Sequence, residues 1–131
     1  MTLLDTHVWV WWVQDDPALP SVMRGWLDAN EKYGLGVSVI SCLEVARAVS
    51  CNRLMLPLPT AEWIQTALRY PHIKLVDLTP QIAIESVQLA GDFHKDPCDR
   101  IIVATARTLN VPLATTDGLI RRYEGVQTVT Y

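Results

Sequence analysis

Four acidic residues stand where a strand is expected to end or a helix to begin. They are Asp5, Glu44, Asp99 and Asp117. Crowded carboxylates repel one another, and some take up protons unless positive charge is supplied. Mg²⁺ and Mn²⁺ prefer oxygen ligands and are held by a few carboxylates together with water and substrate phosphate. If the four acids meet, they therefore predict a divalent-metal site suited to phosphoryl transfer, especially phosphodiester hydrolysis.

Other catalytic patterns are missing. The three cysteines, Cys42, Cys51 and Cys98, form no C-x-x-C pair, which fits a reducing cytoplasm and no disulfide framework. His7 and His94 lack the spacing of zinc ligands, and a lone histidine is more often structural. There is no glycine-rich phosphate loop, and neither a Ser-His-Asp nor a Cys-His arrangement is legible. We therefore expect a cytoplasmic protein whose chemistry depends on its acids.

Size and composition predict a single domain spanning residues 1–131, long enough to bury a core. Half of the residues are hydrophobic and 19% are charged, as in compact soluble proteins. The longest apolar run, VWVWWV, is far shorter than the roughly 20 residues that span a bilayer, so we expect no membrane segment. A net charge of −3 argues against a generally basic nucleic-acid-binding surface but allows a local basic patch.

Strand and helix patterns alternate along the chain. The predicted strands span residues 2–5, 36–40, 73–78, 111–116 and 126–131, and the predicted helices span 20–33, 42–52, 61–70, 80–90, 97–109 and 118–123. The strands are mostly continuous apolar runs, as in strands covered on both faces. We therefore predict an α/β sandwich with a central, mainly parallel sheet of about five strands flanked by helices.

Three helix starts carry capping signals. Thr79-Pro80 and Asp96-Pro97 each place a capping side chain before a proline at the first helical position. The sequence SCLE, from Ser41 to Glu44, has the pattern of a capping box. These signals predict the amino-terminal ends of three helices.

The predicted elements bring the four acids to one edge of the sheet. Asp5 is the last residue of the first predicted strand, and Asp117 directly follows the fourth. Glu44 lies in the predicted first turn of the helix after the second strand. Asp99 lies in the first turn of helix 97–109, which should run antiparallel to the strand after it and so begin at the same edge. Open α/β sheets bind ligands there. The short loop 91–96 is difficult to fit, because the helices on either side of it cannot both descend from that edge, so one should lie across the sheet.

Each acid also has an explanation without a site. A capping box accounts for Glu44, the helix dipole for Asp99 and a turn before Gly118 for Asp117. Asp99 nevertheless shares the apolar stripe that should face the sheet, and an unpaired Asp5 ending a buried strand would be costly to desolvate. Four such coincidences at one edge are less plausible than a site.

The segments LLDTHVWVWW, SCLE, HKDPCDRIIVATA and LATTD, in this order, resemble the successive motifs of PIN-domain ribonucleases, most closely the VapC-type toxins of prokaryotic toxin–antitoxin pairs. The resemblance covers essentially the whole chain and implies a PIN-like three-layer sandwich. It further implies an endoribonuclease that uses Mg²⁺ or Mn²⁺, often a homodimer, inhibited by a partner antitoxin. By resemblance, Asp5, Glu44, Asp99 and Asp117 match the family's acidic metal-binding quartet.

Residues around the quartet have expected roles too. By resemblance, Thr6, Ser41 and Thr116 match hydroxyl positions beside the acids, and we assign them supporting hydrogen bonds. Asp96 resembles the first acid of a D-P-x-D motif, and a helix N-cap is its preferred role. Five cations near the edge are candidate RNA contacts that would grip phosphates without reading bases, although each could equally be a surface charge or a carboxylate partner. They are Arg47, Lys95, Arg100, Arg121 and Arg122.

In the expected reaction, water attacks the phosphodiester in line and leaves a 5′-phosphate and a 3′-hydroxyl. One alternative is a Mg²⁺-dependent phosphatase or phosphotransferase with Asp5 as nucleophile, but that scheme usually needs an acid two residues on, where this chain has His7. Another is a non-catalytic domain that binds RNA or protein. Trp9 is expected in the core, whereas Trp11 and Trp12 are left open between the core and a dimer or antitoxin surface.

Overall fold

The sheet has four parallel strands. The computed structural model describes all residues, Met1–Tyr131. The strands are β1 (Thr2–Leu4), β2 (Leu35–Ser38), β3 (Ile73–Val76) and β4 (Leu113–Ala114), in the order β3-β2-β1-β4. Leu4 pairs with Val37 on one side and with Ala114 on the other, so the central strands end at one level. This places whatever follows β1, β2 and β4 at one edge.

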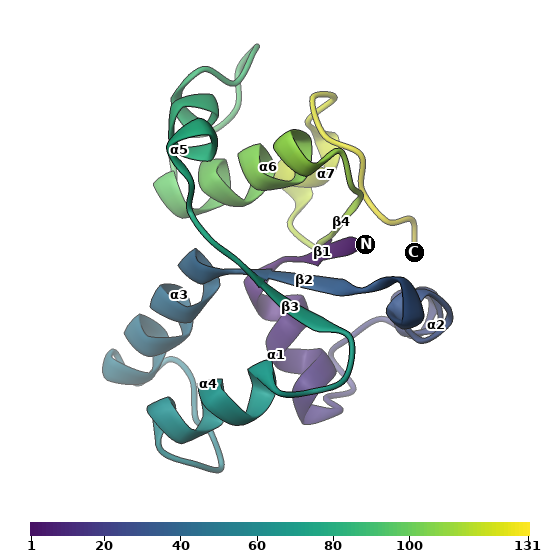
Figure 1. Ribbon diagram of the computed structural model, residues 1–131, viewed down its shortest axis with the longest axis vertical. Coiled ribbons are helices and arrows are strands. Elements are labelled where there is room, and N and C mark those ends of the chain that lie inside the picture. Colours follow the sequence, from purple (N-terminus) through teal and green to yellow (C-terminus); the bar gives the residue numbers. More distant parts are fainter.

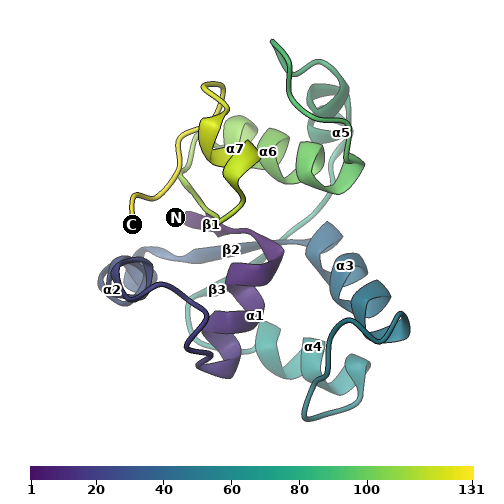
Figure 2. The same ribbon diagram turned by 180° about the vertical axis from the view of Figure 1, so that it is seen from behind.

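Helices cover both faces of the sheet, as Figures 1 and 2 show. One face carries α1 (Thr6–Gln14), α3 (Val39–Ser50) and α4 (Thr60–Leu68), and the other carries α5 (Pro80–Val87), α6 (Pro97–Leu109) and α7 (Gly118–Arg122). Helix α2 (Ser21–Asn30) and the 3₁₀ turn η1 (Glu31–Tyr33) lie beside the edge where the strands begin (Figure 1). The predicted three-layer sandwich is confirmed. No helix combines the length and the apolar character that crossing a membrane needs.

Strand alternation divides the core between the two faces. Leu3 packs with Ile102 and Val103 of α6, whereas Leu4 packs with Val8 and Trp9 of α1. Successive side chains of a strand point to opposite faces, so a two-sided sheet needs such continuous apolar runs. The short strands are therefore held mainly by helix packing on both sides.

Trp9 belongs to the core on the face of the sheet that carries α1, α3 and α4, called the first core below. Its side chain is fully buried and meets Trp63 of α4 edge to face, with ring centroids 5.2 Å apart. The predicted core position of Trp9 is confirmed. Trp11 and Trp12 are half-buried against the same cluster, and Trp11 also lines the cavity described below.

Helix α1 was absent from the predicted elements. It begins one residue after β1 ends, with Asp5 as its N-cap, and contains the run VWVWWV. Valine and tryptophan are poor helix formers, so the local sequence gives little helical signal. Burial of Val8, Trp9 and Val10 against the sheet and α4 overrides that weak propensity.

The capping-box prediction was wrong. Helix α3 begins at Val39, and its N-cap is Ser38, whose hydroxyl accepts the Ile40 N–H at 3.1 Å. Ser41 is consequently a buried residue inside the helix, and Glu44 lies one turn further along than expected. The caps at Thr79 and Asp96 are confirmed, because their side chains accept backbone N–H groups of α5 and α6.

The fifth predicted strand is reduced to one bridge. Residues 126–131 pair with the sheet only between Leu113 and Thr128, so four strands form where about five were expected. β4 is two residues long and offers little edge for pairing. The Arg121 guanidinium donates to the Val129 carbonyl at 2.9 Å and helps to hold this tail beside β4.

The short connection through residues 91–96 is possible because α5 packs on α6 and not on the sheet. Helix α5 packs on α6, and Figure 1 shows it further from the sheet than α6. The hydroxyl of Tyr123 donates to the Ala90 carbonyl at 2.6 Å, and Arg100 donates to the Ser86 carbonyl at 2.8 Å. Helix α6 can therefore begin at the carboxyl edge of the sheet.

Replacing Trp9 by alanine should lower the free energy of unfolding by about 3–5 kcal/mol, because it opens a large cavity in the first core. Urea denaturation measures this change. The control is Trp26→Ala, whose side chain is 39% exposed, and it should cost less than about 1.5 kcal/mol. Similar losses in both variants would contradict the core assignment.

Candidate active site

A cavity of about 470 Å³ at the carboxyl edge collects all the acids that the sequence indicated. Its lining includes Asp5, Glu44, Asp96, Asp99 and Asp117. Asp5 stands between β1 and α1, Glu44 comes from α3, and Asp117 stands between β4 and α7. The predicted convergence of distant segments is thus observed, with Asp96 as a fifth carboxylate beside the predicted four.

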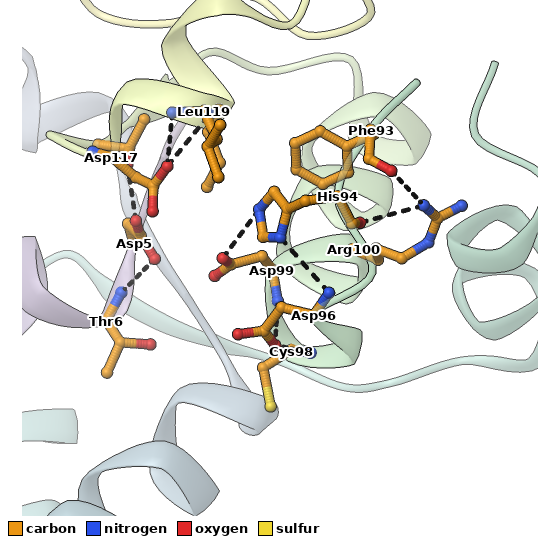
Figure 3. Close-up of polar contacts among 12 residues, drawn as sticks. Asp5, Thr6, Phe93, His94, Asp96, Cys98, Asp99, Arg100, Asp117 and Leu119 are labelled. Carbon is orange, nitrogen blue, oxygen red and sulfur yellow. Dashed lines mark hydrogen bonds and ion pairs between the residues drawn. The ribbon is translucent and has the colours of Figure 1, made fainter. Parts of the chain in front are cut away.

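Asp5 is buried and held from both sides. Its side chain caps α1: Oδ1 accepts the Thr6 N–H at 2.8 Å, and Oδ2 accepts the Thr115 hydroxyl at 2.6 Å (Figure 3 shows the first of these bonds). Burial raises the pKa of this carboxyl, and the two hydrogen bonds oppose that rise. The result is a fixed carboxylate at the floor of the cavity.

Thr6 joins α1 to α3. Its hydroxyl donates to Oε1 of Glu44 at 2.6 Å and lies 2.8 Å from the Ser41 hydroxyl oxygen. Burial raises the pKa of Glu44, the Thr6 bond lowers it, and the charges of Asp5 and Asp96 raise it further. Thr6 and Ser41 therefore make the kind of supporting contacts that the sequence predicted.

Asp99 experiences the crowding most strongly. Burial, followed by the negative charges of the other four carboxylates, raises its pKa to about 7. In Figure 3 its carboxylate points toward His94, and Oδ2 lies 3.1 Å from Nε2 of that histidine. The opposite ring nitrogen, Nδ1, accepts the Asp96 N–H at 3.4 Å. His94 thus connects two of the acids.

Asp96 and Asp117 are helix caps with one oxygen each to spare. Asp117 accepts the N–H groups of Leu119 and Ile120 through Oδ1, at 2.8 and 3.1 Å. Asp96 accepts the N–H of Cys98 through Oδ1 at 2.9 Å, which confirms its preferred role. In both residues Oδ2 has no hydrogen bond within the protein and remains available at the cavity.

Two contacts at the site were not foreseen. Thr116 was expected to support the acids and lines the cavity, but the preceding residue, Thr115, makes the hydrogen bond to Asp5 and accepts the Asp117 N–H at 3.0 Å. Only the backbone geometry after β4 distinguishes the two threonines. The contact between His94 and Asp99 has no spacing signal, because the residues lie on opposite sides of a helix cap.

The site suits a hard cation by donor type and charge. The carboxylates offer only oxygen, and burial, together with the negative charges of neighbouring carboxylates, raises the pKa values of Asp5, Glu44 and Asp99. The side chains do not form a ready cage, since no three His, Cys, Asp or Glu residues are grouped so that they could hold one ion. Mutual repulsion keeps such oxygens apart, so binding an ion would require the side chains to close in.

The candidate RNA-contacting cations fall into two groups. The first is occupied inside the fold: Arg100 donates to the carbonyls of Ser86, Phe93 and His94, and Arg121 donates to those of Thr115 and Val129. These two arginines hold loops in place, which explains them without RNA. The second group is exposed, with no hydrogen bond or ion pair, and comprises Arg47, Lys95 and Arg122.

The crowded acids should make the metal-free protein more stable in mild acid. The pKa of Asp99 rises from 3.8 to about 7 on folding, so between these values the folded protein binds more protons than the unfolded chain. Its contribution to stability is therefore greatest near pH 4 and declines as pH rises through 7. Calorimetry in EDTA should give a higher melting temperature at pH 5 than at pH 8, and Asp99→Asn should weaken that difference. A dependence unchanged by Asp99→Asn would contradict this assignment.

Arg100→Gln should lower the free energy of unfolding by about 2 kcal/mol, because charge-assisted hydrogen bonds to backbone carbonyls are lost. The matched control is Arg122→Gln, which removes an exposed arginine without such bonds and should change stability by less than about 0.5 kcal/mol. Urea denaturation measures the free energy of unfolding of both variants. Equal stabilities would show that Arg100 does not hold the loop.

Comparison with known proteins agrees with this architecture. Residues 2–126 match the PIN domain family. The chain is 32% identical over 128 residues to ribonuclease VapC22 of Mycobacterium tuberculosis, covering 98% of this chain and 95% of that protein.

Solved structures show the same fold at low identity. DNA-bound VapBC from Salmonella typhimurium superimposes with a TM-score of 0.72 at 16% identity, covering 98% of this chain and 96% of that one. A toxin–antitoxin complex from Klebsiella pneumoniae gives 0.65 at 21% identity, covering 99% and 97%. A four-stranded parallel sheet flanked by helices, acids gathered at its carboxyl edge and a match along nearly the whole chain lead to one conclusion. The chain belongs to the PIN domain family.

Proposed function

We propose that this protein is a metal-dependent endoribonuclease that hydrolyses RNA phosphodiester bonds and serves as the toxin of a type II toxin–antitoxin pair. The observation that carries the proposal is the cavity at the carboxyl edge, where five carboxylates from distant segments meet and the pKa of Asp99 rises to about 7. Such a site lacks positive charge and offers only oxygen donors, as a site for a divalent cation does.

The residues proposed to hold the ion are Asp5, Glu44, Asp99 and Asp117. Bound Mg²⁺ or Mn²⁺ would supply an activated water and neutralise charge that grows on the scissile phosphate. The protein's own part is positioning: Thr115 and the start of α1 fix Asp5, and Thr6 orients Glu44. Thr116 lines the cavity but makes no hydrogen bond to an acid.

The relatives support the partners we propose. The Mycobacterium relative is named a ribonuclease, and the Klebsiella structure is a toxin–antitoxin complex. By the same reasoning we propose an antitoxin partner for this chain. We also propose a homodimer, a cytoplasmic location and a single PIN domain spanning residues 1–131, which the comparisons do not test. Candidate RNA contacts are the exposed cations Arg47, Lys95 and Arg122.

The phosphatase alternative has less support. That scheme usually needs a second acid two residues after the nucleophilic aspartate, here Asp5. The position two residues on is His7, which lines the cavity beside Trp11. A purely binding domain would have no need to crowd five carboxylates, whose repulsion lowers stability.

Asp5→Asn should lower the rate of RNA cleavage in Mg²⁺ or Mn²⁺ by about a hundredfold or more while the melting temperature shows a folded protein. The control is Asp77→Asn: Asp77 also directly follows a strand, β3, but is exposed and does not line the cavity. Cleavage of a fluorescent RNA is the measurement. Full activity in Asp5→Asn would exclude the proposed mechanism.

A further inference from the structure

A second cavity, of about 660 Å³, lies next to the acidic one. Loop residues 90–94 form one wall, and α7 with the residues after it forms the other. Pockets that hold a small organic ligand commonly have volumes of roughly 300–1,000 Å³. The cavity is large enough for one nucleotide.

Two residues stand between the two cavities. Leu119 lines the second cavity and lies two residues after Asp117, which lines the first. His94 also lines the second cavity and contacts Asp99 of the first through Nε2. In Figure 3 the Leu119 side chain points toward the space between Asp117 and His94. A chain crossing the acidic cavity would therefore enter the second one directly.

Part of the lining of this second cavity is apolar: four of its eleven residues, Ala90, Phe93, Leu119 and Tyr123, are hydrophobic. Leu119 is 50% exposed although it is a large hydrophobic side chain. The ring of Phe93, which is only 8% exposed, packs against the rings of His94 and Tyr123, with centroids 4.5 and 4.8 Å apart. Nucleic-acid bases bind such surfaces by stacking, with little dependence on sequence.

The same cavity carries a free positive charge. Two arginines and two acids line it: Arg107 is paired with Glu85, and Asp92 and Glu124 are exposed. Arg122 is exposed and has no hydrogen bond or ion pair. Its guanidinium folds back over the start of α7, where a Cβ on Gly118 would lie 3.1 Å from Nη1. Because the acidic cavity repels phosphates, a substrate must be attracted by cations nearby. Of the three exposed candidate cations, Arg122 is the one that lines the cavity beside the acids.

We infer that the cavity between loop 90–94 and α7 is a nucleotide subsite, which binds the base of the RNA residue next to the scissile phosphate on Leu119 and the aromatic wall and its phosphate on Arg122. This inference rests on the proposed ribonuclease function. It predicts a preference for single-stranded substrate, because a paired base must first break its pairing and stacking to enter the cavity.

The test is a binding cycle in EDTA, where no cleavage can occur. Fluorescence anisotropy measures the affinity of wild type and of Leu119→Ser and Arg122→Gln for the labelled RNA 5′-GACUAC-3′, and for six versions that each lack one base. We expect Leu119→Ser to bind about fivefold more weakly than wild type. For wild type, one of the abasic RNAs should bind about fivefold more weakly than the intact RNA. Leu119→Ser should bind that abasic RNA and the intact RNA with the same affinity. Arg122→Gln should weaken all the RNAs and reduce the salt dependence of binding.

The matched controls are Leu58→Ser and Arg69→Gln, which alter exposed residues of the same types outside both cavities and should leave affinity unchanged. The subsite is refuted if Leu119→Ser shows the same losses as wild type with every abasic RNA, or if wild type does not bind the RNA. Cleavage in Mg²⁺ or Mn²⁺ is scored separately. A cleaving enzyme without the coupling disproves the subsite alone, whereas coupling without cleavage supports the subsite and disproves the nuclease.

Discussion

Repulsion among carboxylates at the carboxyl edge of the sheet is the constraint on which the site depends. Five acids line one cavity, and burial together with their mutual charge raises the pKa of three of them. The fold offsets part of the energetic cost of placing these negative charges together. Asp5, Asp96 and Asp117 are N-caps of α1, α6 and α7, so the positive ends of three helix dipoles meet the negative cluster. The remaining excess of negative charge is what a bound cation would neutralise.

The loop between α5 and α6 has an importance that its length does not suggest. Its His94 contacts Asp99, and its Asp96 caps α6. The same loop forms one wall of the second cavity. Arg100 fixes this loop by donating to the carbonyls of Phe93 and His94. An arginine that the sequence offered as an RNA contact thus acts on the protein's own backbone, whereas Arg122 is exposed and makes no such bonds.

Much of the site could be predicted because its acids follow local rules. Asp5 and Asp117 follow apolar strands, Asp96 precedes a helical proline, and parallel strands bring their ends to one edge. Glu44 was correctly predicted to join the other acids, but from a wrong helix start, because the residues read as a capping box lie inside α3. What failed depends on tertiary contacts: α1 forms through burial of residues with low helix propensity, and Thr115 rather than Thr116 reaches Asp5.

The site is expected to bind a divalent ion where the carboxylates converge. The most direct measurement is a crystal structure of the wild-type protein grown with Mn²⁺, with anomalous diffraction recorded to locate manganese. A peak in the acidic cavity, within coordination distance of oxygens from at least Asp5 and Asp99, is the predicted result. An empty cavity at saturating Mn²⁺, with the carboxylates still apart, would contradict the account.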